Sequence, residues 1–170
     1  IVTFAGNHGI AQGLEIIIET ANRLGESSDI VFFFIGDGPV KQSLINLREK
    51  YKISNIIFHP KVPLNQIAKY INMSDILLVP LKKDEIFQTF IPSKMFDFMC
   101  CAKPIILSVD GEARQILEER AKAGKFVPPG DATALSEAIL WLCNRPELCA
   151  EYGRNGREFV LRGYLRNQQA

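Results

Sequence analysis

Short runs of apolar residues alternate with longer segments in which apolar residues recur every three or four positions, and this alternation continues along the whole chain. A period of three to four is typical of helices, and an unbroken run of Ile, Val, Leu and Phe is typical of a parallel strand covered on both faces. The sequence therefore predicts an α/β protein, a doubly wound, Rossmann-like parallel sheet of about six strands joined by right-handed crossovers. The expected strands are residues 1–5, 30–35, 56–59, 76–80, 105–109 and 125–127.

The expected helices are marked by apolar stripes and by residues that commonly begin or end a helix. Gly25 is placed to end the first helix, Pro92 and Pro146 to begin later ones, and Asp131 to cap the helix before the last. A short helix is expected at residues 113–117. Residues 81–91 form an unusually long connection, because most connections from a strand to the following helix are only a few residues long. Ligands of doubly wound sheets bind at the carboxyl ends of the strands, so functional residues are expected in the loops there.

Composition excludes several classes of protein. The chain has 170 residues, the length of one domain, and its 47% hydrophobic and 23% charged residues exclude a disordered chain. The 20 Lys and Arg residues against 19 Asp and Glu give no basic surface for a nucleic acid. No apolar run approaches the ~20 residues that span a bilayer, and no signal peptide is visible. We expect a soluble, cytoplasmic domain, and because the chain begins at Ile1 rather than Met, a piece of a longer protein.

The four cysteines carry no expected chemistry. They form no Cys-x-x-Cys pair, and the only histidines are His8 and His59, so the pattern argues against a zinc site. Cysteines within apolar helical patterns of a cytosolic protein are typical of buried, reduced thiols. We expect this state for Cys100, Cys101, Cys143 and Cys149.

A glycine-rich segment, residues 6–13, separates the first strand from the first helix. Glycines let the backbone approach a phosphate, and the following helix start supplies free N–H groups, so phosphate binding is one interpretation. The spacing is not the dinucleotide fingerprint, and in the second such turn Lys41 stands where its third glycine would be. The alternative, that these glycines only make tight turns, stays open.

A second candidate site is the helix start at residues 91–97. The amides of Ser93 and Lys94 would face an anion, and the Lys94 ammonium would add a positive charge. Asp97 lies one turn further on, where a carboxylate can accept two hydrogen bonds from a diol such as ribose. A solvated lysine, and an ion pair between Lys94 and Asp97, are the structural alternatives.

Residues for acid, base or nucleophilic catalysis are scarce. His8 and His59 fit a structural role better than that of a base, and no Ser, His and Asp arrangement has a recognisable spacing. The carboxylate pairs at residues 84–85 and 110–112 are of a kind common in surface loops. No Asp-x-Asp occurs, so a metal-bound diphosphate is not expected.

Several short motifs follow one another in a fixed order along nearly the whole chain. They are Phe4-Ala5-Gly6 with Gly13, the Phe-Ile-Gly-Asp-Gly-Pro segment 34–39, Ser74-Asp75-Ile76, residues 99–106 and the Val-Pro-Pro-Gly-Asp segment 127–131. In this order they resemble the C-terminal, nucleotide-sugar-binding domain of GT-B glycosyltransferases, in the retaining group 1 family that builds bacterial surface polysaccharides. Residues 11–15 and 91–96 are similar to the branch that transfers amino sugars such as N-acetylfucosamine in O-antigen or capsule assembly.

The resemblance implies roles for particular positions. Two glutamates of the family face the donor, one near the sugar and one on the ribose, and their positions here are Thr89 and Asp97. An Arg and a Lys of the family hold the diphosphate, and the matching Asn7 and Gln12 are neutral. We hypothesise that Lys94 and the amides at the helix start stabilise the leaving nucleoside diphosphate instead.

On this resemblance, residues 1–170 are expected to be one half of a GT-B fold, the donor domain of a transferase that uses a UDP-sugar with retention and without a metal. The expected donor residues are Gly6, Asn7, Gln12, Gly36, Lys61, Val62, Thr89, Ser93, Lys94 and Asp97, with Lys61 and Val62 at the base and with Lys94 and Thr89 as the catalytic positions.

The expected partners are an N-terminal domain of the same protein, absent from this chain, and a lipid-linked glycan acceptor at the inner face of the plasma membrane. Without that domain, the chain is expected to bind nucleotide but to transfer no sugar. Two alternatives stay open. A nucleotide-sugar 2-epimerase half would need carboxylate bases at the sugar, and a non-catalytic α/β binding module would need an acidic pocket after its first strand, where this sequence has Gly6-Asn7-His8.

Overall fold

The sheet predicted from the sequence is present in the computed structural model, which describes residues 1–25 and 29–163. Six parallel strands lie in the order β3-β2-β1-β4-β5-β6. They are β1 (Val2–Ala5), β2 (Phe32–Ile35), β3 (Ile56–His59), β4 (Ile76–Pro80), β5 (Ile105–Ser108) and β6 (Gly124–Phe126). The order reverses at β1, as in other doubly wound folds, so the loops after β1 and β4 leave the sheet on either side of one switch point.

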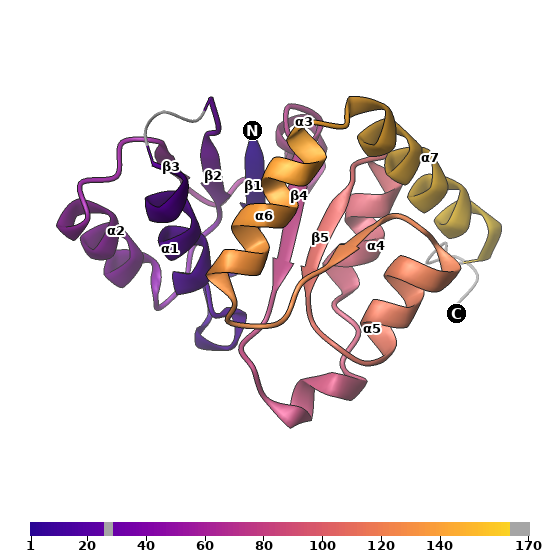
Figure 1. Ribbon diagram of the computed structural model, residues 1–170, viewed down its shortest axis with the longest axis horizontal. Helices are drawn as coiled ribbons and strands as arrows, with labels where there is room; N and C mark the ends of the chain where they lie inside the picture. The colour runs from indigo at the N-terminus through magenta and orange to yellow at the C-terminus, as the bar shows by residue number, and fades with distance from the viewer. Residues whose placement is uncertain (26–28, 164–170) are drawn as a thin grey trace.

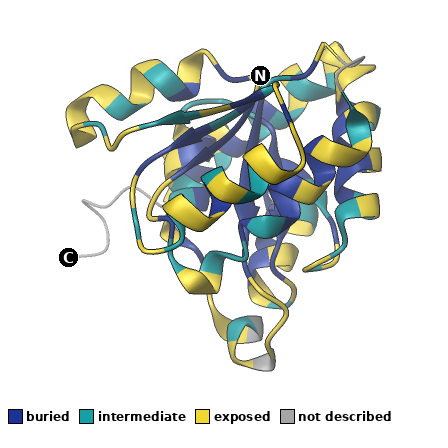
Figure 2. Ribbon diagram, turned by 90° about the vertical axis from the view of Figure 1, so that its left-hand side faces the viewer, coloured by how far each residue is buried: buried dark blue, intermediate teal, exposed yellow. Residues whose placement is uncertain are grey.

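The helices cover both faces of the sheet (Figure 1). They are α1 (Glu15–Leu24), α2 (Lys41–Lys50), α3 (Leu64–Asn72), α4 (Ser93–Cys100), α5 (Glu112–Arg114), α6 (Ala132–Cys143) and α7 (Pro146–Gly163). One face packs against α1, α2 and α6, and the other against α3, α4 and α5, while α7 contacts both cores, with Tyr152 against the first and Val160 in the second. Figure 2 shows the consequence: buried strands lie between helices whose outer sides are exposed.

Each face of the sheet has its own hydrophobic core. The first contains Phe4 and Phe34 from the strands and Ile17 and Ile139 from helices α1 and α6. The second contains Leu77, Leu107, Met95 and Met99 among others. Strands β1 and β4 send alternate side chains into the two cores, which explains why their sequences show no polar alternation.

Local details refine the sequence-based expectations. The connection 81–91 is not an open loop, because Glu85–Thr89 forms a short 3-10 helix, η2, and the Asp84 carboxylate accepts a hydrogen bond from its Ile86 amide at 3.0 Å. The short helix expected at 113–117 begins at Glu112 and continues as a π-helix, η3 (Gln115–Arg120). The predicted cap of α6 is confirmed, since the Asp131 side chain accepts a hydrogen bond from the Ala134 amide at 2.8 Å.

The expectation of buried cysteines is wrong. None of the four is joined in a disulfide within the described part of the chain, but Cys100 and Cys143 are exposed and Cys101 and Cys149 are half-buried. Cys100 and Cys143 are the last residues of α4 and α6, and Cys101 follows α4, so helical spacing does not decide their burial. Within the described residues, no helix is both long and apolar enough to cross a bilayer.

Candidate functional site

Two glycine turns touch each other at the carboxyl edge of the sheet. The Gly6 amide donates to the Ile35 carbonyl at 2.9 Å, and the backbone of Gly36 lies so close that a Cβ there would overlap the Gly6 carbonyl oxygen. Gly36 also has a φ of 140°, a conformation that residues with a side chain rarely adopt. Gly36 is therefore required for the close approach, and we refer to the contact of Gly6 with Gly36 as the glycine crossing.

Backbone hydrogen bonds hold the two turns together. The His8 amide donates to the Asp37 carbonyl at 2.8 Å, and the Val40 amide donates to the His8 carbonyl at 3.1 Å. A Cβ at Gly38 would overlap both the His8 carbonyl and the Asn7 side-chain oxygen, which places Asn7 against the second turn. The crossing is thus a rigid, backbone-lined surface beside the ends of β1 and β2.

Lys94 reaches this surface from α4. Its Nζ donates to Gln12 Oε1 at 2.7 Å, lies 4.5 Å from the centre of the Phe4 ring and is 3.2 Å from where a Gly6 Cβ would stand. Burial lowers the pKa of Lys94 to about 8, because water is excluded from the ammonium. The acceptor of its side-chain hydrogen bond is thus the neutral amide oxygen of Gln12.

The first turn also contacts the segment after β4. The Lys82 amide donates to the Ala11 carbonyl at 2.9 Å, and the Lys82 side chain packs on Gly13. Lys94 and Gln12 are therefore brought together by the pairing of β1 with β4, which places their loops side by side. The structure links four of the sequence-predicted residues by contacts, because Lys94 lies against both Gln12 and Gly6, and Gly6 lies against Gly36.

Sequence reasoning missed Lys41. It is the first residue of α2, and its Nζ donates to the Gly36 carbonyl at 2.9 Å, so a second ammonium lies at the glycine crossing. Its position directly after the Gly-Asp-Gly-Pro turn was the available signal, since a helix that starts at this sheet edge brings its first side chains back to the crossing.

His8 is fully buried beneath the first turn. Its ring lies among three aromatic rings, with centroids at 5.7 Å from Phe4, 6.0 Å from Phe34 and 6.5 Å from Phe58. Burial and the charges of Lys41 and Lys94 lower the pKa of His8 to about 4, although the charge of Asp37 acts in the opposite direction. A neutral ring at this depth packs as part of the core, in keeping with the structural role expected for it.

The remaining predicted positions lie around the crossing at greater exposure. Ser93 opens α4 directly after Pro92, and the first amides of a helix have no intrahelical partner, so they face the loops of this edge. Asp97 is exposed one turn further along α4, and Thr89 is exposed at the end of η2. Each lies at the predicted end of the sheet, and their roles stay predictions.

The two residues that were expected to contact the nucleobase of the donor follow β3. Lys61 is exposed, whereas Val62 is half-buried and packs on the second core. The neighbouring His59 ring lies 4.8 Å from the Tyr70 ring and 5.8 Å from the Phe33 ring. This gives the β3 end of the site an aromatic and apolar wall.

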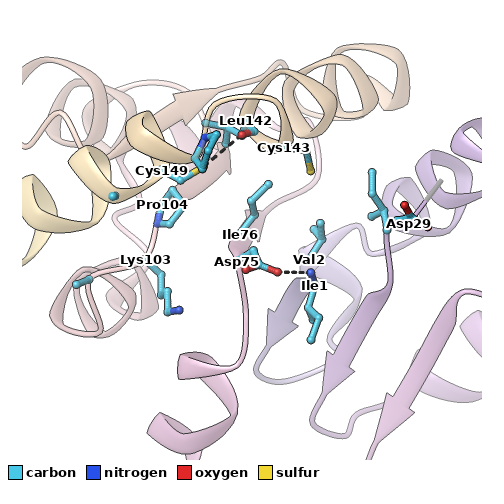
Figure 3. Close-up of a pocket in the computed structure, with 14 residues that line it drawn as sticks. Ile1, Val2, Asp29, Asp75, Ile76, Lys103, Pro104, Leu142, Cys143 and Cys149 are labelled. Atoms are coloured by element: carbon cyan, nitrogen blue, oxygen red, sulfur yellow. Dashed lines mark hydrogen bonds and ion pairs between the residues drawn. The ribbon is translucent and has the colours of Figure 1, made fainter.

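A cavity of about 420 Å³ lies elsewhere, at the amino ends of the strands (Figure 3). The amino group of Ile1 pairs with Asp75 at 2.5 Å, and the Cys149 thiol donates to the Leu142 carbonyl at 3.4 Å. Lys103 and Cys143 also line this cavity. None of the sequence-predicted donor residues contributes to its lining.

No group of three His, Cys, Asp or Glu side chains in residues 1–25 and 29–163 is arranged to hold a metal ion. The expectation that no metal takes part stays a prediction.

Comparison with known proteins identifies the family. The family model described as glycosyl transferases group 1 matches residues 1–159. The chain belongs to this family. A curated relative, O-antigen chain mannosyltransferase C of Escherichia coli, is 27% identical over 159 residues, which are 91% of this chain and 40% of the relative. The chain spans about two fifths of the length of the curated relatives it matches.

Solved structures of glycosyltransferases share the fold. A TarM mutant of S. aureus, solved with fondaparinux, alpha-GlcNAc-glycerol and UDP, has a TM-score of 0.83 at 17% identity. The match covers 96% of this chain and 32% of the TarM chain. The C-terminal domain of the group 1 protein LpcC from Francisella tularensis has a TM-score of 0.79 at 18% identity, and the match covers 97% of this chain and 86% of that one. The expected GT-B architecture of this group 1 domain is thereby confirmed.

Proposed function

We propose that this group 1 domain binds the nucleotide-sugar donor, a UDP-sugar, of a transferase that acts with retention in surface polysaccharide synthesis. The observation that supports it most is the half-buried Lys94 ammonium, which donates to Gln12 at the glycine crossing and whose pKa is lowered by the exclusion of water. A buried cation is costly unless an anion or several hydrogen bonds compensate it, and here the side-chain acceptor is the neutral Gln12 amide. A diphosphate over Gly6 would supply the missing negative charge.

The proposed contacts follow the order of the elements along the edge. Lys94 and the first amides of α4, at Ser93 and Lys94, bind the diphosphate together with Gly6 and Asn7. Lys61 and Val62 contact the uracil beside the apolar end of β3. Asp97 binds the ribose hydroxyls, and Thr89 faces the sugar.

Lys94 also has a proposed part in the reaction. When the glycosidic bond breaks, negative charge develops on the leaving UDP, and a fixed ammonium in a poorly hydrated site stabilises that charge more than it stabilises the ground state. Transfer on the front face of the sugar needs no protein nucleophile, in keeping with the lack of one in the sequence.

We also propose what the rest of the protein contributes, which acceptor it uses and where it works. An N-terminal domain of similar fold would supply the acceptor site, a lipid-linked glycan would be the acceptor, and the enzyme would work in the cytoplasm at the membrane's inner face. An amino sugar of the N-acetylfucosamine type is the proposed donor sugar. The E. coli relative is named as an O-antigen mannosyltransferase, which supports the polysaccharide but not the amino sugar.

Calorimetric titration of UDP into the chain tests the donor site. We expect binding by the unmodified chain and a loss of about 10- to 100-fold in affinity for Lys94→Ala, the effect of one charge-assisted hydrogen bond. Lys103→Ala is the matched control, because Lys103 likewise donates to a neutral oxygen, the Asn72 carbonyl, but lies at the amino edge of the sheet. Absence of UDP, GDP and ADP binding in the unmodified chain would refute the proposal.

Turnover of the full-length enzyme tests the second role of Lys94. We expect Lys94→Ala to lower kcat by at least tenfold at saturating donor. A kcat within a few-fold of the unmodified enzyme would restrict Lys94 to binding.

A further inference from the structure

We propose that Lys41 is the second cation for the donor's diphosphate and acts beside Lys94 at the glycine crossing. This inference rests on the proposed function, because it assigns a residue to the diphosphate of the same donor. Lys41 would supply a positive charge that the neutral Asn7 and Gln12 do not provide.

A series of short contacts through Gly36 and Gly6 links the Lys41 ammonium to the Lys94 ammonium. Lys41 Nζ is 2.9 Å from the Gly36 carbonyl oxygen, Gly36 lies against Gly6, and Lys94 Nζ is 3.2 Å from the position of a Gly6 Cβ. Both lysines therefore contact the glycine crossing, where Gly6 is exposed and has no side chain to keep a ligand from its backbone.

The charges at the crossing are unbalanced. None of the ion pairs among the described residues includes Lys41 or Lys94. Both ammoniums act on the His8 ring below, where each lowers its pKa. The opposing carboxylate is Asp37, which is exposed and accepts a hydrogen bond from the Gly38 amide at 2.9 Å. Two lysines against one solvated carboxylate leave a net positive charge for an anion.

The chemistry of lysine fits this use. An ammonium has three donors, so Lys41 can keep its bond to the Gly36 carbonyl and still donate to a phosphate oxygen. Only part of its side chain is buried, and its flexible stem allows the short movement that such a contact needs. A nucleoside diphosphate carries two or more negative charges, so two ammoniums match it better than one.

The test compares nucleoside diphosphates with monophosphates, in uracil and guanine nucleotides in parallel so that the result does not depend on the base. We expect Lys41→Met, which keeps the stem and removes the charge, to weaken UDP binding by about tenfold and UMP binding much less. Lys41→Arg should restore most of the UDP affinity. Lys50→Met is the matched control, because Lys50 is an exposed lysine at the other end of the same helix.

The outcomes separate the two proposals. If the unmodified chain binds no nucleoside diphosphate, the proposed function fails and the role of Lys41 fails with it. If the chain binds UDP and Lys41→Met binds it equally well, only the role of Lys41 is refuted. An equal loss of UDP and UMP affinity would also refute it, because it would show that Lys41 merely supports the Gly36 turn.

Discussion

The His8 side chain combines two properties that have opposite effects on stability. Its ring fills the space among Phe4, Phe34 and Phe58, which favours folding, while burial without a hydrogen-bond partner for either ring nitrogen among the described residues disfavours its charged form. The neighbouring Lys41 and Lys94 disfavour that form further. The fold therefore holds this histidine neutral, and its protonation opposes folding.

This coupling predicts a pH dependence of stability. The pKa of His8 falls from 6.5 to about 4 on folding, so its contribution is complete above pH 6.5 and is lost as the pH falls from there towards 4. The shift corresponds to a loss of about 3 kcal/mol in the free energy of unfolding. Urea unfolding between pH 7.5 and 4.5 measures it, and the loss should be much smaller in His8→Leu.

His59 provides the control for this experiment, because its ring is only half-buried and its Nδ1 lies 2.8 Å from the Pro60 carbonyl oxygen. His59→Asn should keep the acid-dependent loss. An identical pH profile for His8→Leu and the unmodified chain would contradict the assignment to His8.

At the scale of single elements, two glycines control how α7 docks. A Cβ at Gly153 would overlap the carbonyl oxygen of Ala102, and one at Gly156 would press on Ala123 and Met99. The helix therefore approaches α4 more closely than a helix with side chains at these positions could. These glycines cost helix propensity, and the close packing offsets that cost.

The substitution Gly153→Ala should therefore destabilise the domain although alanine favours helices. We expect the overlap with backbone to cost about 2 kcal/mol or more after the gain in propensity. Gly163→Ala in the same helix has open space around the added methyl group, so it should be neutral or slightly stabilising. Thermal unfolding of both variants checks this, and equal Tm values would show that α7 can shift to admit the methyl group.

The elements also show which features the sequence could predict. Each strand agrees with its expected range to within two residues at either end, and in β1, β4 and β5 continuous burial on both faces leaves an unambiguous apolar run. The π-helix η3 was not predicted, and a contact distant along the chain accompanies it, since the Glu118 carboxylate accepts a hydrogen bond from the Phe126 amide at 2.8 Å. Helical spacing gave no such signal.

The site was predictable in position but not in its contacts. Strand order places the glycine turns and the start of α4 at one sheet edge, as expected. The bond between Lys94 and Gln12 joins residues far apart in the chain and depends on rotamers, so no local pattern contains it. Lys41 was overlooked for the same reason, because its importance comes from the distant Gly6 that Gly36 touches.

On the scale of the whole molecule, the sheet couples the two cores, and α7 contacts both of them, through Tyr152 and Val160. Strand β1 contributes Phe4 to the first core and Ala5 to the second, and β4 divides its side chains in the same way. Damage to one core therefore disturbs the backbone on which the other packs. We expect the described domain to unfold in a single cooperative transition.

The single tryptophan makes this testable. Trp141 packs on the first core from α6, whereas Leu107 is fully buried in the second core on β5. Leu107→Ala should cost about 2–5 kcal/mol, the usual effect of a cavity in a core, and should shift the unfolding midpoint seen by Trp141 fluorescence as much as the midpoint seen by circular dichroism. Leu161→Ala on the exposed side of α7 should move neither midpoint appreciably. A Trp141 transition that stays in place while the circular dichroism midpoint falls would show that the two cores unfold separately, because the sheet would then not transmit the loss from one face to the other.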